Sequence, residues 1–159
     1  MPIRPRILIE NACYHIITRG NARQEIFLND MDRLRYLALV KRVKTKFGFK
    51  LYGYCLMPNH VHLLIEPKRP KDTAGIMRSL NLAYTRRFNY KYKRVGHLWQ
   101  GRFKSKVILK DNYLFDCLRY IEFNPVRANI TDTPEGYMWS SYRYNMDADK
   151  NGLLDEIEI

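Results

Sequence analysis

The sequence predicts an α+β domain in which a split βαβ arrangement forms an antiparallel sheet with helices on one face, followed by an added C-terminal helix. Segments that alternate like strands and segments with helical spacing follow one another in the order β-α-β-β-α-β-α. The chain has 159 residues, 46% of them hydrophobic, which is enough for one domain with a substantial core. This is the ferredoxin-like or RRM-like order of elements.

Each element follows from a local pattern. Four strands are expected where apolar residues alternate or cluster between turn residues, at residues 13–18, 50–57, 61–66 and 103–109. Three helices are expected where apolar residues recur at intervals of three and four, at residues 30–47, 73–92 and 112–124. Gly48 is expected to end the first helix and Pro125 the last one. We expect residues 1–146 to form a single domain and residues 147–159 a C-terminal tail.

A pair of histidines stands on the second strand of the predicted hairpin. His60 and His62 are separated by Val61, and because strand side chains alternate, both imidazoles point to the same face of the sheet. Imidazoles at this spacing can both reach one divalent metal ion, with a third ligand from elsewhere in the fold. The alternative, in which one histidine packs and the other hydrogen-bonds to a neighbour, is about equally frequent.

The last predicted helix offers further polar groups on one face. Tyr113, Tyr120 and Asn124 stand at positions i, i+7 and i+11, beside an apolar stripe that faces the core. The carboxamide oxygen of Asn124 is a hard ligand that suits Mg²⁺ or Mn²⁺. Tyr120 lies one turn earlier and has the chemistry of a nucleophile that forms a covalent intermediate. On spacing alone, a simple packing role for Tyr120 is the more frequent outcome.

The net charge of +12 is concentrated in one block. Residues 68–110 contain 13 Lys and Arg against one acid, Asp72, and the rest of the chain is neutral. Basic residues interleaved with aromatic ones suit a single-stranded nucleic acid, although a solvated basic helix has the same composition. The candidate contact residues in this block are Arg86, Arg87, Trp99, Gln100, Arg102, Lys104 and Lys106.

The remaining composition points to a reducing compartment. Three cysteines, an odd number in scattered apolar contexts, make a disulfide framework improbable. The first residues lack the pattern of a signal peptide, and no run of 18 apolar residues predicts a membrane span. A cytoplasmic, nucleoid-associated protein without a membrane partner is therefore expected.

Five ordered motifs carry a resemblance to a known family. The chain resembles the REP-associated tyrosine transposases, a branch of the HUH-class single-strand DNA transposases of the IS200-like superfamily. The motifs extend over roughly residues 3–145, and they read YHIITRGNARQEIF (14–27), GYCLMPNHVHLLIE (53–66), HLWQGRFKS (97–105), YLFDCLRYIEFNPVRA (113–128) and WSSY (139–142).

The resemblance implies a function and a site. It implies a metal-dependent enzyme that cleaves and rejoins single-stranded DNA at hairpin-forming repeats through a 5′-phosphotyrosine intermediate. The family's nucleophile falls on Tyr120, and its ligands for Mg²⁺ or Mn²⁺ fall on His60, His62 and Asn124. It also implies that residues 68–110 hold the DNA backbone, and that the protein works as a monomer or a homodimer.

Two other classes of protein fit the same residues. One is a non-catalytic single-stranded nucleic-acid binding protein on the same fold. The other is a metal-dependent hydrolase that uses water, with Tyr120 in a structural role. The acidic end of the tail is expected either to lie over the basic segment and regulate it, or to pack weakly.

Overall fold

A four-stranded antiparallel sheet forms the centre of the molecule. The computed structural model describes residues 5–146 and 152–158. The strands are β1 (Cys13–Arg19), β2 (Lys50–Met57), β3 (His60–Glu66) and β4 (Lys104–Ile108). They pair in the order β2-β3-β1-β4, so β1 and β3 are central while β2 and β4 are the edges.

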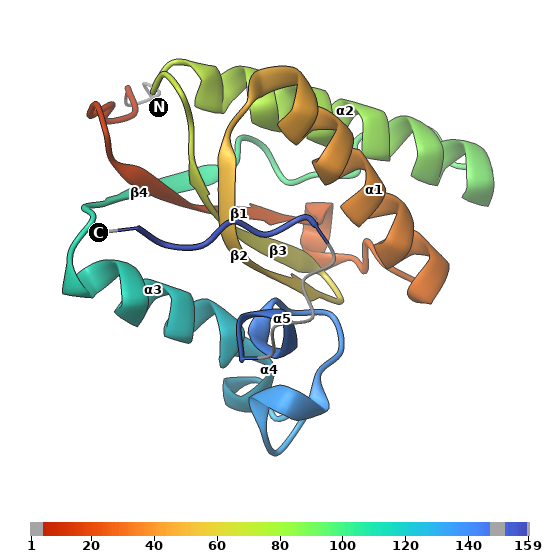
Figure 1. Cartoon of the computed structure of the whole chain (residues 1–159). Coiled ribbons are helices and arrows are strands. Elements are labelled where there is room, and N and C mark those ends of the chain that lie inside the picture. The colour runs from red at the N-terminus through yellow and green to blue at the C-terminus, as the bar shows by residue number, and fades with distance from the viewer. Residues whose placement is uncertain (1–4, 147–151, 159) are drawn as a thin grey trace.

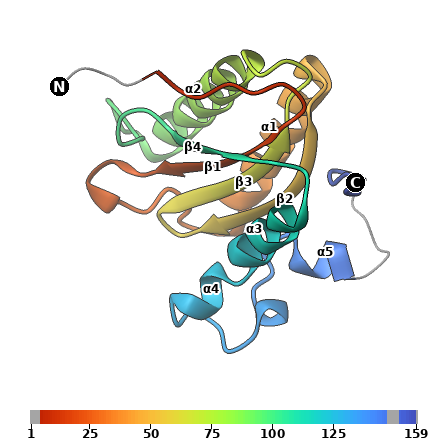
Figure 2. The ribbon, with the colours of Figure 1, turned by 90° about the vertical axis from the view of Figure 1, so that its left-hand side faces the viewer.

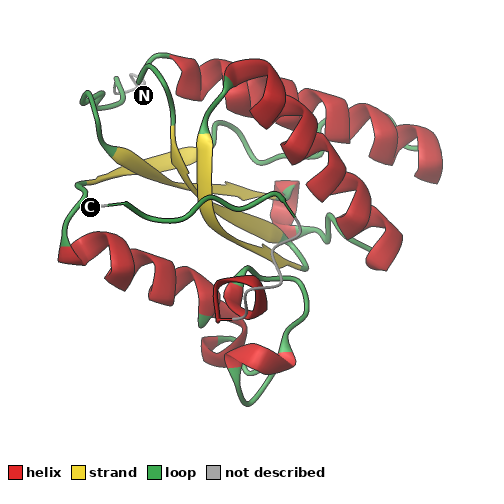
Figure 3. Cartoon of the chain, in the orientation of Figure 1, coloured by secondary structure: helices red, strands yellow, loops and turns green. Residues whose placement is uncertain are grey.

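Helices cover both faces of this sheet. The helices are α1 (Asp30–Phe47), α2 (Asp72–Tyr92), α3 (Asn112–Glu122), α4 (Asn124–Arg127) and α5 (Tyr142–Met146), and the short 3₁₀ turns are η1 (Asn21–Arg23) and η2 (Pro134–Gly136). Figures 1 and 2 show α1 and α2 together on one side of the sheet and α3 on the other. Figure 3 shows the strands as a layer between these two groups of helices. The predicted α+β fold, with two helices on one face and an added C-terminal helix, is confirmed.

The two faces of the sheet enclose two separate cores. On β3, Val61, Leu63 and Ile65 point toward α1 and α2 and belong to the larger core. Leu64 points to the opposite face, where it joins a smaller core with residues of α3. His60 and His62 share the face of Leu64, because strand residues two apart point the same way. The predicted alternation therefore holds, and the histidines lie on the side of α3.

Helix α1 begins and ends where the sequence predicts. Asn29 caps its start, because the side-chain oxygen of Asn29 accepts a hydrogen bond from the backbone N–H of Asp32. Gly48 ends the helix in the left-handed conformation, with φ of 73°. Helix α2 also closely matches its predicted range.

The last predicted helix is broken in two. Helix α3 begins after Asp111, whose carboxylate accepts from the N–H of Tyr113, but it ends at Glu122, and residues 124–127 form the separate helix α4. The prediction of one helix to residue 124 was wrong, because Pro125 has no N–H with which to continue the hydrogen bonds of α3. Pro125 instead lies in the first turn of α4, where that group is not needed.

The outer edge of β2 is covered by C-terminal segments. The carbonyl of Trp139 accepts from the N–H of Leu56, and Ser141 donates from its N–H to the carbonyl of Tyr54. Asp155 reaches the same strand, since its carboxylate accepts from the N–H of Leu51. Sheet edges are commonly protected in this way. The described part of the tail, residues 152–158, thus lies along β2, where Leu153 and Leu154 are buried in the larger core.

Gly20 follows β1 directly, and the backbone of the next turn leaves no space for a side chain at this position. A Cβ atom built there would lie 2.3 Å from the backbone carbonyl oxygen of Gln24. Backbone atoms cannot move aside as a side-chain end can, so Gly20→Ala must displace the turn over η1. We expect the variant to lower the free energy of unfolding by about 1–3 kcal/mol, measured by urea denaturation.

Gly136→Ala is the matched control for this variant. A Cβ at Gly136 would make only ordinary contacts, the nearest at 3.4 Å. The control is therefore expected to stay within about 0.5 kcal/mol of the wild type. Equal stabilities of the two variants would contradict the proposed close approach at Gly20.

Candidate metal and nucleophile site

Three histidines meet on the face of the sheet that α3 covers. The imidazole centroids of His60 and His62 are 5.0 Å apart. His15 on β1 joins them, because Nε2 of His15 lies 2.8 Å from Nδ1 of His62. The antiparallel register places Ile17 opposite His62, so His15 reaches it diagonally. His15 and His62 are buried, and His60 is half-buried.

Asn124 completes this group from the other side of the break in the helix. Its Nδ2 atom lies 2.7 Å from Nε2 of His62. Rotating the carboxamide by 180° exchanges Nδ2 for Oδ1, and the two orientations are distinguished only by their hydrogen bonds. The carboxamide of Asn124 and Nε2 of His62 therefore face each other at a distance at which two atoms can share one metal ion.

Tyr120 stands over the same histidines. Its ring centroid is 6.1 Å from that of His15 and 6.4 Å from that of His62, in edge-on orientations. The residue is 50% exposed, so its hydroxyl is accessible to a ligand from solution. The buried positions Leu114, Cys117 and Ile121 hold α3 against the sheet and thereby present Tyr120 at its margin.

The side chain of Arg127 contacts Tyr120, the candidate nucleophile, at two points. Its guanidinium carbon lies 3.9 Å from the centroid of the Tyr120 ring, and its Nη2 donates a hydrogen bond to the carbonyl of Tyr120. A guanidinium in this position stacks on the aromatic face and adds positive charge beside the hydroxyl. Arg127 belongs to α4 and Tyr120 to α3, so this contact joins the two helices across the break between them.

Burial keeps the three imidazoles neutral at physiological pH. Burial lowers the pKa of His15 to about 4, and Lys106 on β4 adds to this shift. Burial likewise lowers the pKa of His60 to about 4, with a contribution from Arg19. The pKa of His62 falls to about 2, mainly through burial and then through its histidine neighbours. Neutral imidazoles have the lone pairs that metal ligation requires.

These low pKa values predict how stability depends on pH. Below pH 6.5 the histidines of the unfolded chain take up protons, whereas His15 and His60 of the folded chain do so only near pH 4. Their contribution to stability is therefore complete above pH 6.5 and is lost as the pH falls toward 4. We expect the protonation of each of these two histidines in the unfolded chain to lower the free energy of unfolding by at most about 2 kcal/mol as the pH falls from 7 to 5. Urea denaturation in EDTA measures this.

The buried carboxyl of Glu122 also changes stability with pH, in the opposite direction, and the experiment must account for it. Burial raises the pKa of the Glu122 carboxyl, so this group opposes the histidines as the pH falls. The measurement is therefore repeated in Glu122→Gln, which keeps an acceptor for Ser141. A stability that stays constant from pH 7 to pH 5 in this variant would contradict the buried, neutral state of the histidines.

The donor set fits a hard or borderline divalent cation. No group of three His, Cys, Asp or Glu side chains within residues 5–146 and 152–158 has the geometry of a metal site, so the three histidines do not form one by themselves. The available set is His60, His62 and the carboxamide oxygen of Asn124. The amide oxygen suits Mg²⁺ or Mn²⁺, the two imidazoles favour the transition metal Mn²⁺ of these two, and the three ligands leave coordination positions free for a substrate. Nδ1 of His60 is 2.7 Å from Oδ1 of Asn59, which leaves Nε2 as its ligand atom.

The predicted nucleic-acid contacts divide between the two sides of the sheet. Lys104 and Lys106 on β4 stand opposite Ile17 and His15, so they share the face of the histidines. Both are exposed and line a groove between β4 and α3 that reaches Tyr120. They extend the candidate site with positive charge.

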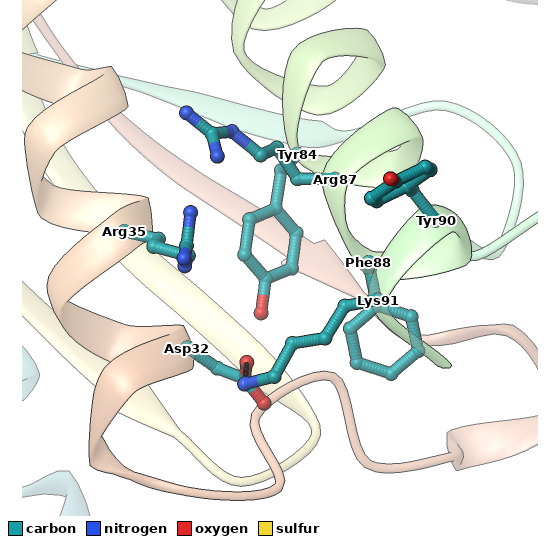
Figure 4. A pocket seen from close by; sticks show the side chains of 7 residues that line it. All are labelled: Asp32, Arg35, Tyr84, Arg87, Phe88, Tyr90 and Lys91. Carbon is teal, nitrogen blue, oxygen red and sulfur yellow. Dashed lines mark hydrogen bonds and ion pairs between the residues drawn. The ribbon is translucent and has the colours of Figure 1, made fainter. Parts of the chain in front are cut away.

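Arg86 and Arg87 lie elsewhere, exposed on α2 in the helical layer across the sheet. Figure 4 shows Arg87 at a small cavity between α1 and α2, opposite Arg35. At the bottom of this cavity Lys91 forms an ion pair of 2.7 Å with the buried carboxylate of Asp32. The basic block of the sequence therefore places charges both on α2 and on the histidine face of the sheet.

The loop before β4 carries the other three candidates. Trp99 is half-buried, and its indole N–H donates to the carbonyl of Asn81 at 3.2 Å. Gln100 is exposed and donates from its backbone N–H to the carbonyl of Arg19, the residue paired with His60. Arg102 is exposed near the N-terminal arm. Gln100 is therefore close to the histidine face, while Trp99 anchors the loop.

Sequence reasoning favoured a structural role for His15, on a strand that could lie next to the site, and assigned no role to Arg127. His15 belongs to the strand next to the histidine pair, and its alternation with Tyr14 was the one available signal. Arg127 stands seven residues after Tyr120, a spacing that fits one helical face, but the predicted helix was expected to end before it. The three cysteines are buried, unpaired thiols. No helix among the described residues is long and apolar enough to span a membrane.

Comparisons with known proteins relate this site to a family. Residues 9–124 match the family model described as transposase, IS200 like. A curated protein of Haemophilus influenzae that is named a REP-associated tyrosine transposase is 28% identical over 138 residues, which cover 80% of this chain and 77% of the relative.

Two solved structures share the fold. One is a REP-associated tyrosine transposase bound to a REP hairpin, which superposes with a TM-score of 0.75 at 17% identity over 100% of both chains. The other comes from Deinococcus radiodurans and is named a transposase; it has a TM-score of 0.51 at 21% identity and covers 76% of this chain and 96% of that chain. At such identities the superpositions establish the fold.

The family model extends over most of the chain, from just before β1 to Asn124, the first residue of α4. This range contains His60, His62, Tyr120 and Asn124. The prediction that the protein is an enzyme of this class is confirmed: the chain belongs to the IS200-like transposase family and is a DNA transposase.

Proposed function

We propose that this transposase cleaves and rejoins single-stranded DNA at hairpin-forming repeats, with Tyr120 as the nucleophile and a divalent metal ion, Mg²⁺ or Mn²⁺, held by His60, His62 and Asn124. The observation that carries the proposal is the meeting of two imidazoles, a carboxamide and an accessible tyrosine at one end of the sheet. The relative bound to a REP hairpin, with the same fold, supports a hairpin-bearing substrate and the REP-associated branch of the family.

The chemistry is a transesterification. The Oη atom of Tyr120 forms a bond to the scissile phosphorus, and the bond from phosphorus to the 3′ oxygen breaks. The phenolic proton is released, and the departing 3′ oxygen takes up a proton, so the products are a free 3′-OH and a 5′-phosphotyrosine. No water is consumed, so attack by a 3′-OH on the phosphotyrosine reverses the step and joins strands.

The protein groups divide this work. A bound Mg²⁺ or Mn²⁺ would supply Lewis-acid stabilisation of negative charge on a non-bridging phosphate oxygen. Arg127 holds the ring of Tyr120 and adds positive charge next to the scissile phosphate. Lys104 and Lys106 bind the DNA backbone along the groove that leads to Tyr120.

The test uses a single-stranded oligonucleotide that contains a hairpin-forming inverted repeat with single-stranded flanks. The oligonucleotide is labelled at the 3′ end in one sample and at the 5′ end in another, and each is incubated with the full chain and Mn²⁺ and then denatured. The 3′ label is expected to stay on the protein, because a 5′-phosphotyrosine retains the downstream fragment. The 5′ label is expected to be released with a free 3′-OH.

Two results would contradict the proposal. Retention of the 5′ label would mean that the enzyme keeps the other side of the cleaved bond. Binding of the hairpin with no cleavage under any divalent cation would favour the non-catalytic binding protein on this fold.

A further inference from the structure

His62 is held between two polar partners, one on each ring nitrogen. Nδ1 lies 2.8 Å from Nε2 of His15, and Nε2 lies 2.7 Å from Nδ2 of Asn124. The rings of His15 and His62 are stacked, with centroids 5.1 Å apart and an interplanar angle of 26°. Only 8% of His15 and 3% of His62 are exposed, so water does not compete for the bond between them.

The bond to His15 decides what the other nitrogen of His62 can do. A neutral imidazole has one N–H donor and one lone-pair acceptor. If Nδ1 of His62 donates to Nε2 of His15, then Nε2 of His62 carries the lone pair and is free to bind a metal ion. If the roles are reversed, Nε2 of His62 carries a hydrogen and cannot act as a ligand. The same contact therefore either enables the metal site or blocks it.

We propose that His15 is a positioning residue, which accepts a hydrogen bond from Nδ1 of His62 and so directs the lone pair of Nε2 toward Asn124. The inference rests on the proposed function, because it concerns a ligand of the proposed metal site. His15 is suited to this role because β1 is a central strand, paired on both sides, whose register with β3 holds the two rings in place. Second partners of this kind orient metal-binding histidines and raise their basicity.

Two substitutions separate hydrogen bonding from packing. His15→Leu fills the space but offers no acceptor, whereas His15→Gln places a carboxamide oxygen close to the position of Nε2. We expect His15→Leu to weaken Mn²⁺ binding about 10- to 100-fold and His15→Gln to remain within about threefold of the wild type. Binding is measured by electron paramagnetic resonance titration of the full chain with Mn²⁺ alone. The control is His97→Gln, an exposed histidine outside the site, with no expected change.

A second measurement reports on the hydrogen directly. The chain has only four histidines, so their ring nitrogens can be assigned in ¹⁵N NMR spectra by comparing single variants. In the metal-free wild type, His62 is expected to carry its hydrogen on Nδ1. In His15→Leu this preference is expected to weaken, with hydrogen appearing on Nε2. This readout does not depend on catalysis.

The outcomes distinguish this inference from the proposed function. If His62→Ala binds Mn²⁺ as well as the wild type does, the proposed metal site is wrong. If His62→Ala loses the ion while His15→Leu retains full affinity, only the role of His15 is overturned. The role of His15 is also overturned if His15→Gln binds Mn²⁺ no more tightly than His15→Leu does. The same follows if Nε2 of His62 carries the hydrogen in the metal-free wild type. The wild-type spectrum decides the question even if His15→Leu fails to fold.

Discussion

Replacing Tyr120 with phenylalanine is expected to abolish the covalent protein–DNA adduct, with a loss of at least about 10³-fold in the rate of strand cleavage. The substitution removes only the hydroxyl. The ring of Tyr120 packs beside His15 and His62 and beneath Arg127, and phenylalanine preserves those contacts. Folding and hairpin binding should therefore persist, and gel analysis of the denatured reaction measures the adduct.

Tyr113→Phe is the matched control for this result. Tyr113 is on the same helix, two turns earlier, and is 71% exposed at the start of α3. Tyr113 lines the same groove, but the ring contacts of the site histidines involve Tyr120, so the control should form the adduct. Adduct formation by Tyr120→Phe would assign the nucleophile to another residue. Cleavage without an adduct in both the wild type and Tyr120→Phe would instead support the hydrolase that uses water.

Removing a metal ligand is the second change that is expected to slow strand cleavage strongly. His60→Ala and His62→Ala should each reduce the cleavage rate by about 10²-fold or more, because the charge that builds up on the phosphate loses its stabilisation. EDTA should do the same to the wild type, and added Mn²⁺ should restore the wild type only. The readout is the initial rate of cleavage of the labelled hairpin at saturating Mn²⁺.

His60→Ala is the cleaner of these two variants. His62 contacts both His15 and Asn124, whereas the hydrogen-bond partner of His60 is the neighbouring Asn59. His60→Ala should therefore leave the hairpin affinity nearly unchanged, which separates a loss of chemistry from a loss of structure. Full cleavage activity of His60→Ala in EDTA would exclude the metal-assisted mechanism.

The parts of the site that lie within four residues of each other were predictable from the sequence. His60 and His62 follow the period of a strand, and Tyr120 and Asn124 follow the period of a helix, so each pair could be assigned to one face. The position of Pro125 marked the end of that helix, although the helix stops before Asn124 and a second one begins there. Local rules suffice where the partners are a few residues apart.

The other contacts depend on pairings between distant segments. His15 meets His62 only because β1 lies beside β3 in a particular register, which the strand pattern does not encode. Arg127 contacts Tyr120 across the break between α3 and α4, a contact that helix periodicity did not assign. The basic block appeared continuous in sequence, but the sheet separates the charges of α2 from those of β4. Such facts follow from tertiary structure.

The two separate cores have a consequence for the proposed chemistry. The larger core holds the sheet and the helices α1 and α2, while α3 and its tyrosine depend on the smaller core beneath them. Because the two clusters have different buried residues, we expect substitutions in the smaller core to affect α3 more than α1 and α2. A change in the smaller core is therefore expected to displace Tyr120 while the sheet, with Lys104 and Lys106 on it, stays folded, so the proposed chemistry can be lost separately from the fold.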